Sequence, residues 1–115
     1  MDRPNRLGVR ARQRLVESPD VHVSALTSLE FQIKAMLGKF SFPSDLEDRW
    51  SDVGVAPLPF TVAHANTLPR FPELARHDPF DRMLLAQASY EELHFLTADA
   101  VLLGLGYDWI VDAAA

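Results

Sequence analysis

Strand-like and helix-like segments alternate along this chain, and that alternation constrains the fold more than any other feature. Short runs rich in β-branched and aromatic residues are expected to be extended at 21–25, 55–61, 93–97 and 107–111. The second of these contains two prolines, so it can only be an edge strand. Because consecutive parallel strands need a helical crossover between them, the pattern predicts a parallel sheet in a layered α/β domain.

The helical segments carry their own start and stop signals. Helices are expected at about 7–18, 27–37, 44–53, 62–68 and 79–92, with a single helical turn after 98. Two of them are predicted to begin with capping boxes, formed by Thr27 with Glu30 and by Ser44 with Glu47. Thr61 is expected to cap the fourth helix, and Gly38 and Gly54 are expected to end the second and third.

Apolar residues at helical spacing predict which side of each helix is buried. The predicted buried stripes are Leu7, Val9, Leu15 and Val16 in the first helix, Leu29, Ile33, Met36 and Leu37 in the second, Leu46, Trp50 and Val53 in the third, and Phe80, Met83, Leu84 and Ala88 in the fifth.

Length and composition restrict the classes that remain. A chain of 115 residues with 48% apolar residues predicts a single domain spanning 1–115, of which 1–6 are expected to be flexible. No apolar run approaches the roughly 18 residues of a membrane helix, and the N-terminus lacks the apolar core of a secretory signal. The absence of cysteine excludes disulfides, thiol catalysis and cysteine metal sites, and is typical of a cytoplasmic protein.

Charge is unevenly distributed. The net charge of −5 argues against nucleic-acid binding by the whole surface. Against that background, five arginines crowd the start of the chain: Arg3, Arg6, Arg10, Arg12 and Arg14. They are either the solvated face of a helix or a patch for RNA or an acidic partner peptide.

The segment "HDPFDRMLLAQA", residues 77–88, places two aspartates around a proline at the start of a helix. Asp78 is predicted to be the N-cap, Pro79 the first helical residue and Asp81 the third. Capping explains both acids, and a metal site is the alternative explanation for Asp81.

The predicted topology brings three acids toward one end of the sheet. Glu30 follows the strand at 21–25, and Asp99 follows the strand at 93–97. Asp81 begins a helix that runs antiparallel to the next strand, so it is expected at the same edge, where α/β sheets bind ligands. Clustered carboxylates suit the hard ions Mg²⁺ and Mn²⁺. Each acid also has a purely structural explanation as a helix cap or the start of a turn.

The segments "VSALTSLEFQIKAMLGKFSFP", "LPFTVAHA", "LPRF", "HDPFDRMLLAQA" and "LHFLTADA" resemble, in that order, the PIN-domain family and within it the VapC-type toxins of bacterial toxin–antitoxin pairs. The resemblance implies a three-layer α/β/α fold with a parallel sheet. It implies an endoribonuclease that depends on Mg²⁺ or Mn²⁺, is silenced by a VapB-type antitoxin and forms a homodimer. The family's acidic residues fall on Glu30, Asp81 and Asp99.

One feature of the family is missing from this sequence. PIN domains open with a short apolar strand that ends in a metal-binding aspartate, and no such strand precedes "PNRLGVRARQRL". The resemblance therefore implies an N-terminally incomplete sheet, reduced stability and weak or absent catalysis. The alternative function is that of a catalytically inactive PIN-like module which dimerises or binds an antitoxin.

Other polar and aromatic residues are weaker candidates. His77 and Arg82 lie close enough to Asp81 in sequence to contact a phosphate of RNA. The other histidines, His22, His64 and His94, show no metal-ligand spacing. Trp50 and Trp109 are expected to contribute packing and not base stacking.

Overall fold

A computed structural model describes residues 8–18, 20–39, 46–76 and 78–115. Its contacts divide the chain into two compact units, which we describe separately: unit 1 contains the N-terminal residues up to Pro19 together with 91–115, and unit 2 contains Asp20–Tyr90. The expected flexibility of 1–6, the capping box of Ser44 with Glu47, and His77 lie outside the described residues. The single-domain organisation stays a prediction.

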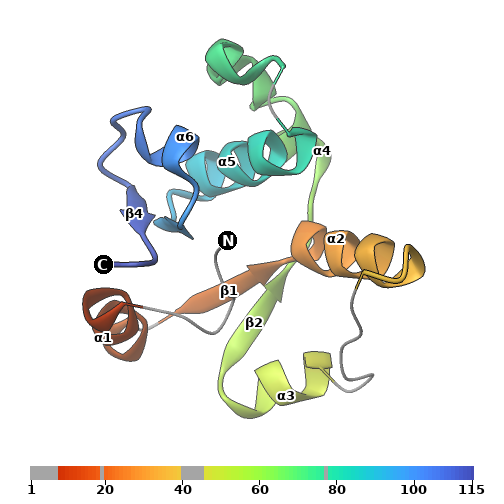
Figure 1. The fold of residues 1–115 in the computed structure, drawn as a ribbon, viewed down its shortest axis with the longest axis vertical. Coiled ribbons are helices and arrows are strands. Elements are labelled where there is room, and N and C mark those ends of the chain that lie inside the picture. The colour runs from red at the N-terminus through yellow and green to blue at the C-terminus, as the bar shows by residue number, and fades with distance from the viewer. Residues whose placement is uncertain (1–7, 19, 40–45, 77) are drawn as a thin grey trace. The chain divides into compact units, whose positions relative to one another are not determined.

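Unit 2 is built around a parallel pair of strands (Figure 1). Its elements are β1 (Val21–Ser24), α2 (Ala25–Met36), α3 (Leu46–Asp52), β2 (Val55–Leu58), α4 (Val62–Ala65), two 3-10 turns (Leu68–Arg70 and Pro72–Leu74) and α5 (Pro79–Glu91, whose last residue belongs to unit 1). The two strands run in register from Val21 beside Val55 to Ser24 beside Leu58. The predicted extended segment with its prolines is therefore a strand, and it lies at an edge of a two-stranded sheet.

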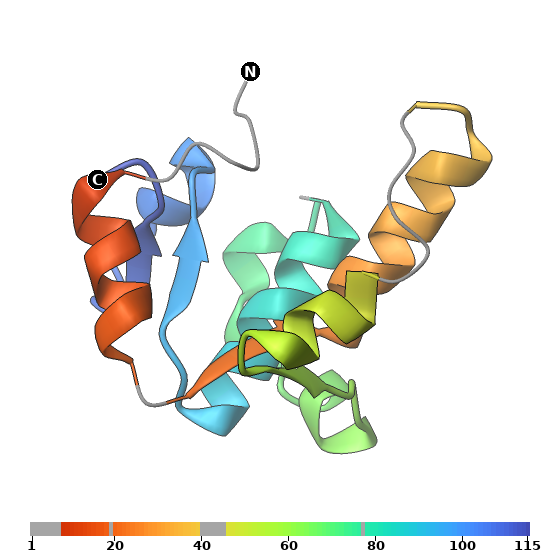
Figure 2. The same cartoon turned by 90° about the horizontal axis from the view of Figure 1, so that it is seen from below.

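Unit 1 combines α1, which begins just after Gly8, with the C-terminal segment of the chain (Figure 2). Its elements are α1 (Val9–Glu17), β3 (Phe95–Thr97), α6 (Ala100–Leu103) and β4 (Ile110–Asp112). The strands β3 and β4 pair in parallel. The backbone N–H groups of Gly8 and Arg10 donate to the carbonyls of Ala113 and Ala115 at 2.9 and 3.0 Å, so the chain after β4 satisfies donors at the start of α1.

The predicted α/β class with parallel strand pairing is confirmed. Within the described ranges the strands form two two-stranded parallel sheets, one in each unit. None of the helices in these ranges is long and apolar enough to cross a bilayer.

Unit 2 contains most of the described core. Its fully buried apolar residues come chiefly from the 3-10 turns and α5: Leu26, Phe71, Leu74, Leu85, Ala86 and Ala88. The described buried apolar residues of unit 1 are Ala11, Leu102 and Ile110. Of the stripe predicted for α5, Ala88 is buried and Phe80, Met83 and Leu84 are half-buried.

The stripe predicted to be buried in α2 is exposed, which is the clearest correction to the sequence analysis. Leu29, Ile33, Met36 and Leu37 are 49, 39, 85 and 66% exposed. The helix packs instead through its other side, where Thr27, Ser28, Phe31 and Ala35 are half-buried. The stripe of α1 is also mostly wrong, because Val9 and Val16 are 82 and 80% exposed, and Val53 after α3 is 75% exposed.

The cap of α2 also differs from the prediction. Ser24 is the N-cap, and its hydroxyl accepts the N–H of Leu26 at 3.0 Å. The helix thus begins before Thr27, and the predicted box of Thr27 with Glu30 does not form because Glu30 already lies in the second turn. The predicted helix ends are confirmed: Gly38 and Gly54 follow α2 and α3 with φ of +73 and +84°, a conformation that glycine adopts without a steric penalty.

The start of α4 contains a capping box in which histidine is the third helical residue. The Thr61 hydroxyl accepts the His64 N–H at 3.3 Å, as the predicted cap requires, and the Thr61 N–H donates to Nδ1 of His64 at 3.0 Å. The His64 ring is 1% exposed and lies 5.4 Å from the rings of Phe60 and Tyr90. His64 is therefore a core residue of unit 2.

A buried amide links α5 to the end of β2. Gln87 is 2% exposed, and its Nε2 donates to the carbonyls of Leu58 and Pro59 at 3.4 and 3.1 Å. These contacts fix the position of α5 against the strand that precedes α4.

Gln87→Leu is expected to lower the free energy of unfolding by about 0.5–1.5 kcal/mol, because two part-buried hydrogen bonds to the carbonyls of Leu58 and Pro59 are lost. Urea denaturation followed by circular dichroism measures this loss, with Gln32→Leu on the exposed surface of α2 as the control. Equal stability of the two variants would show that the amide contributes nothing.

Candidate functional site

Asp78 starts α5 in the way the sequence predicts. Its Oδ1 accepts the N–H of Phe80 at 2.8 Å, and Pro79 is the first helical residue. Asp81 follows in the first turn and is half-buried. With Asp78 serving as the cap, Asp81 is not needed as the N-cap of this helix.

The sequence explained Glu30 as part of a capping box at the start of a helix, and this capping box does not form in the structure. Glu30 lies in the second turn of α2, and within the described ranges it forms an ion pair with Lys34, whose Nζ lies 3.4 Å from Oε2. The side chains of Glu30 and Lys34 are 28 and 46% exposed. A helical pair of this kind contributes only about 0.3–0.5 kcal/mol, so the fold gives little reason for the acid at this position.

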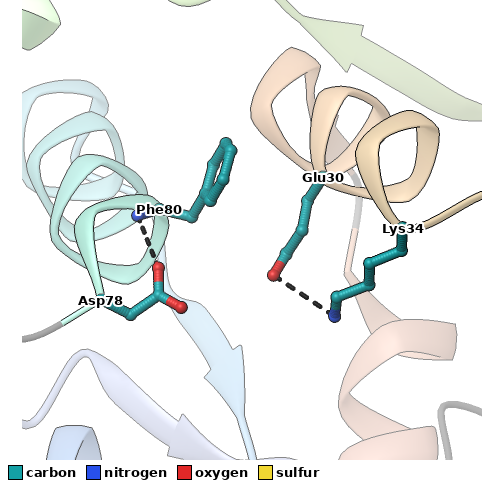
Figure 3. A network of polar contacts seen from close by, with 4 residues as sticks. All are labelled: Glu30, Lys34, Asp78 and Phe80. Atoms are coloured by element: carbon teal, nitrogen blue, oxygen red, sulfur yellow. Dashed lines mark hydrogen bonds and ion pairs between the residues drawn. The ribbon is translucent and has the colours of Figure 1, made fainter. Parts of the chain in front are cut away.

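Figure 3 shows how Glu30 and the start of α5 are arranged within unit 2. The side chains of Glu30 and Asp78 extend from α2 and α5 toward the same space between the two helices, and Lys34 lies on that side of α2. Glu30 and Asp78 therefore face one region, although they are separated by about fifty residues of sequence.

Asp99 is the N-cap of α6. Its Oδ1 accepts the N–H groups of Val101 and Leu102 at 2.8 and 3.1 Å, and its own N–H donates to Oγ1 of Thr97 at 3.1 Å. It follows the end of β3, as predicted. Asp99 belongs to unit 1, whereas Glu30 and Asp81 belong to unit 2, so the approach of all three carboxylates stays a prediction.

No group of three or more candidate ligand side chains gathers anywhere in the described ranges. Mg²⁺ does not require such a group, because it is commonly held by one or two carboxylates with water and substrate phosphates completing its shell. The ammonium of Lys34 provides the positive charge next to Glu30 in this structure.

Arg82 is the remaining described candidate for a phosphate contact. The residue is half-buried, and its buried Nε has no hydrogen-bond partner in the structure as far as the described residues extend. The described ranges contain no ion pair between Arg82 and Asp78. A buried donor without an acceptor is costly, so Arg82 stays a candidate for binding an anion.

The described arginines of the N-terminal segment lie on α1. Arg10, Arg12 and Arg14 are all exposed, as a solvated helix face requires.

Trp109 is half-buried and its ring lies 5.4 Å from that of Tyr107, which agrees with the packing role predicted for it.

Comparisons of this chain with protein-family models, with curated proteins and with solved structures find no match.

Proposed function

We propose that this chain is a PIN-like domain of the VapC type, a metal-dependent endoribonuclease that hydrolyses phosphodiester bonds of RNA. The observation that supports this most is the arrangement of α2 and α5, in which Glu30 and the helix cap Asp78 point toward one region of unit 2 (Figure 3), with Asp81 in the first turn that follows Asp78. The two parallel strand pairs are compatible with the proposed three-layer α/β/α fold.

The proposed chemistry assigns a role to each acid. Glu30 and Asp81 hold the cation directly, and Asp99 either binds it or orients the attacking water. Bound Mg²⁺ or Mn²⁺ supplies positive charge to the phosphate and lowers the pKa of the water. Arg82 and His77 would contact the RNA phosphate.

The proposed partners follow from the same resemblance. They are an RNA substrate, a VapB-type antitoxin and a second copy of the chain, and the proposed location is the cytoplasm.

A second candidate function is a binding module without catalysis. The exposed apolar stripe of α2 favours it, because a stripe of this kind is typical of a surface that associates with another protein. In this function the acids of α2 and α5 contribute only to folding.

Metal binding by the purified chain distinguishes the two functions. Glu30→Gln is expected to weaken Mn²⁺ binding, measured by titration calorimetry, by at least about tenfold, because a neutral amide replaces an anionic ligand. Lys34→Met is expected to strengthen the binding, because it removes a cation that competes for Glu30. Two exposed residues of unit 2 provide the controls, Glu73→Gln and Lys39→Met.

The two changes should move the affinity in opposite directions while both controls leave it unaltered. If the parent chain binds no Mn²⁺, or if Glu30→Gln binds as tightly as the parent, the acids do not form a metal site and the binding module is the better proposal.

A further inference from the structure

The basic residues of this chain are concentrated at its N-terminal end. Residues 1–19 contain five of the eleven lysines and arginines but only two of the sixteen acids, Asp2 and Glu17. Residues 20–115 contain six basic and fourteen acidic side chains. A polyanion that approaches this protein is therefore repelled by the charge of residues 20–115 and attracted by that of the N-terminal segment.

Two arginines of α1 lie on the same side of the helix. Arg10 and Arg14, which we call the α1 arginine pair, are four residues apart, which is about 6 Å along a helix. Both are exposed, and so is Arg12, which lies toward the opposite side of the helix. The helix packs through a different stripe, in which Ala11 is buried and Leu15 is half-buried. The pair is therefore accessible to a ligand.

The positive charge of the pair is not neutralised by another described residue. Neither arginine takes part in an ion pair within the described ranges. Glu17, the acid of α1, lies three residues after Arg14, but its Oε2 accepts a hydrogen bond from Nε2 of Gln13 at 3.2 Å. On α2, by contrast, the exposed Lys34 is paired with Glu30.

The position of Arg10 is unfavourable for the helix itself. It lies in the first turn of α1, where the helix dipole favours an acid, and this turn contains none. Arg14 adds the repulsion of a like charge one turn away. The N-cap, Gly8, makes no side-chain hydrogen bond that would offset this cost. Helix formation therefore does not explain the pair, whereas an anion bound by both arginines would remove their repulsion.

An extended polyphosphate fits the pair better than a single ion does. A guanidinium group binds phosphate through two parallel hydrogen bonds. A nucleic-acid strand carries one phosphate on every nucleotide whatever its sequence, so two arginines at a fixed spacing can meet two phosphates of one strand. RNA is the polyanion on which the proposed nuclease acts.

We propose that the α1 arginine pair binds the phosphate backbone of single-stranded RNA and positions the strand on unit 1. The choice of RNA rests on the proposed nuclease function. The site itself is additional, because Arg10 and Arg14 belong to unit 1, whereas Glu30 and Asp81 belong to unit 2. Contacts to phosphate carry no sequence information, so the binding is independent of base sequence and sensitive to salt.

RNA binding without metal tests this proposal. The probe is a fluorescein-labelled oligouridine of about twelve nucleotides, kept intact by EDTA and followed by fluorescence anisotropy from about 50 to 200 mM salt. Combining Arg10→Gln with Arg14→Gln is expected to weaken binding at least about tenfold at the lower salt concentration. The slope of log affinity against log salt should fall by roughly 1.4, because each lost phosphate contact removes about 0.7 for a single strand.

Two control chains separate the pair from net charge and from folding. Arg12→Gln combined with Lys39→Gln removes the same number of positive charges from exposed positions outside the pair, and it should bind the oligouridine almost as the parent does. Arg10→Lys combined with Arg14→Lys should keep the salt slope of the parent, because lysine also neutralises a phosphate. Circular dichroism checks that α1 remains folded in every variant.

Three results would overturn the proposal. They are a parent chain that does not bind the oligouridine up to about 1 mM, a glutamine variant of the pair that binds as the control chain does, and pair-dependent binding of polyglutamate without binding of oligouridine. The last result would identify an acidic peptide as the ligand. Because EDTA removes metal from these measurements, they are independent of the Mn²⁺ titration of Glu30, which tests the proposed nuclease function separately.

Discussion

Asp81→Asn is expected to reduce metal-dependent RNA cleavage at least about a hundredfold, a loss of about 2.7 kcal/mol in transition-state stabilisation. This expectation rests on the proposed nuclease function. The amide has almost the shape of the carboxylate but lacks its charge, so it is a poor ligand for Mg²⁺ or Mn²⁺. Cleavage of a fluorescent RNA, with and without EDTA, measures the effect.

Asp78 provides a matched control three residues away. Its carboxylate caps α5 through the N–H of Phe80, and asparagine caps helices as well as aspartate does. Asp78→Asn should therefore retain both fold and cleavage. If Asp81→Asn cleaves RNA as fast as Asp78→Asn, then Asp81 is not part of the site.

Local features of this fold could be predicted from the sequence because they depend on neighbouring residues. The cap at Asp78 follows from an acid placed before a proline at the start of an apolar helix. The turns at Gly38 and Gly54 follow from the left-handed backbone that ends each helix. Parallel pairing follows from the helices between consecutive strands.

The orientation of α2 could not be predicted in the same way. Helical periodicity identifies the more apolar side of a helix, but it does not say whether that side meets the chain's own core or another molecule. In α2 the half-buried side contains the small residues Thr27, Ser28 and Ala35 with Phe31, and the apolar stripe described above is exposed. The start of α2 was predicted at Thr27 for a related reason. Ser24 and Thr27 are both residue types that cap helices well, and the helix begins after Ser24 because β1 ends there.

The candidate site was predictable only in part. The sequence identified Glu30, Asp81 and Asp99 as acids that follow strands or begin helices. The structure confirms those local positions for Asp81 and Asp99, whereas Glu30 lies in the second turn of α2 and not at its start. Lys34 was not identified, although its spacing of four residues from Glu30 is a recognisable signal. The core role of His64 was also missed, because the third residue of a capping box is usually Glu or Gln.

His64→Ala is expected to lower the free energy of unfolding by about 2–5 kcal/mol, the range for replacing a large buried side chain with alanine. The ring is 1% exposed between Phe60 and Tyr90, and its Nδ1 accepts the N–H of Thr61. Removing it creates a cavity and leaves that donor unpaired. Urea denaturation measures the free energy of unfolding. The decrease expected for His64→Ala is comparable to the whole free energy of unfolding of a small domain.

Two further variants separate packing from capping. His64→Gln restores the usual third residue of a capping box, so it should recover about 1 kcal/mol relative to His64→Ala while the ring contacts remain lost. Val62→Ala, on the same helix but with a side chain 77% exposed, should change stability by less than about 0.5 kcal/mol. If His64→Ala were as stable as Val62→Ala, the ring would not be part of a packed core, and the start of α4 would not be anchored against α5 as the structure describes.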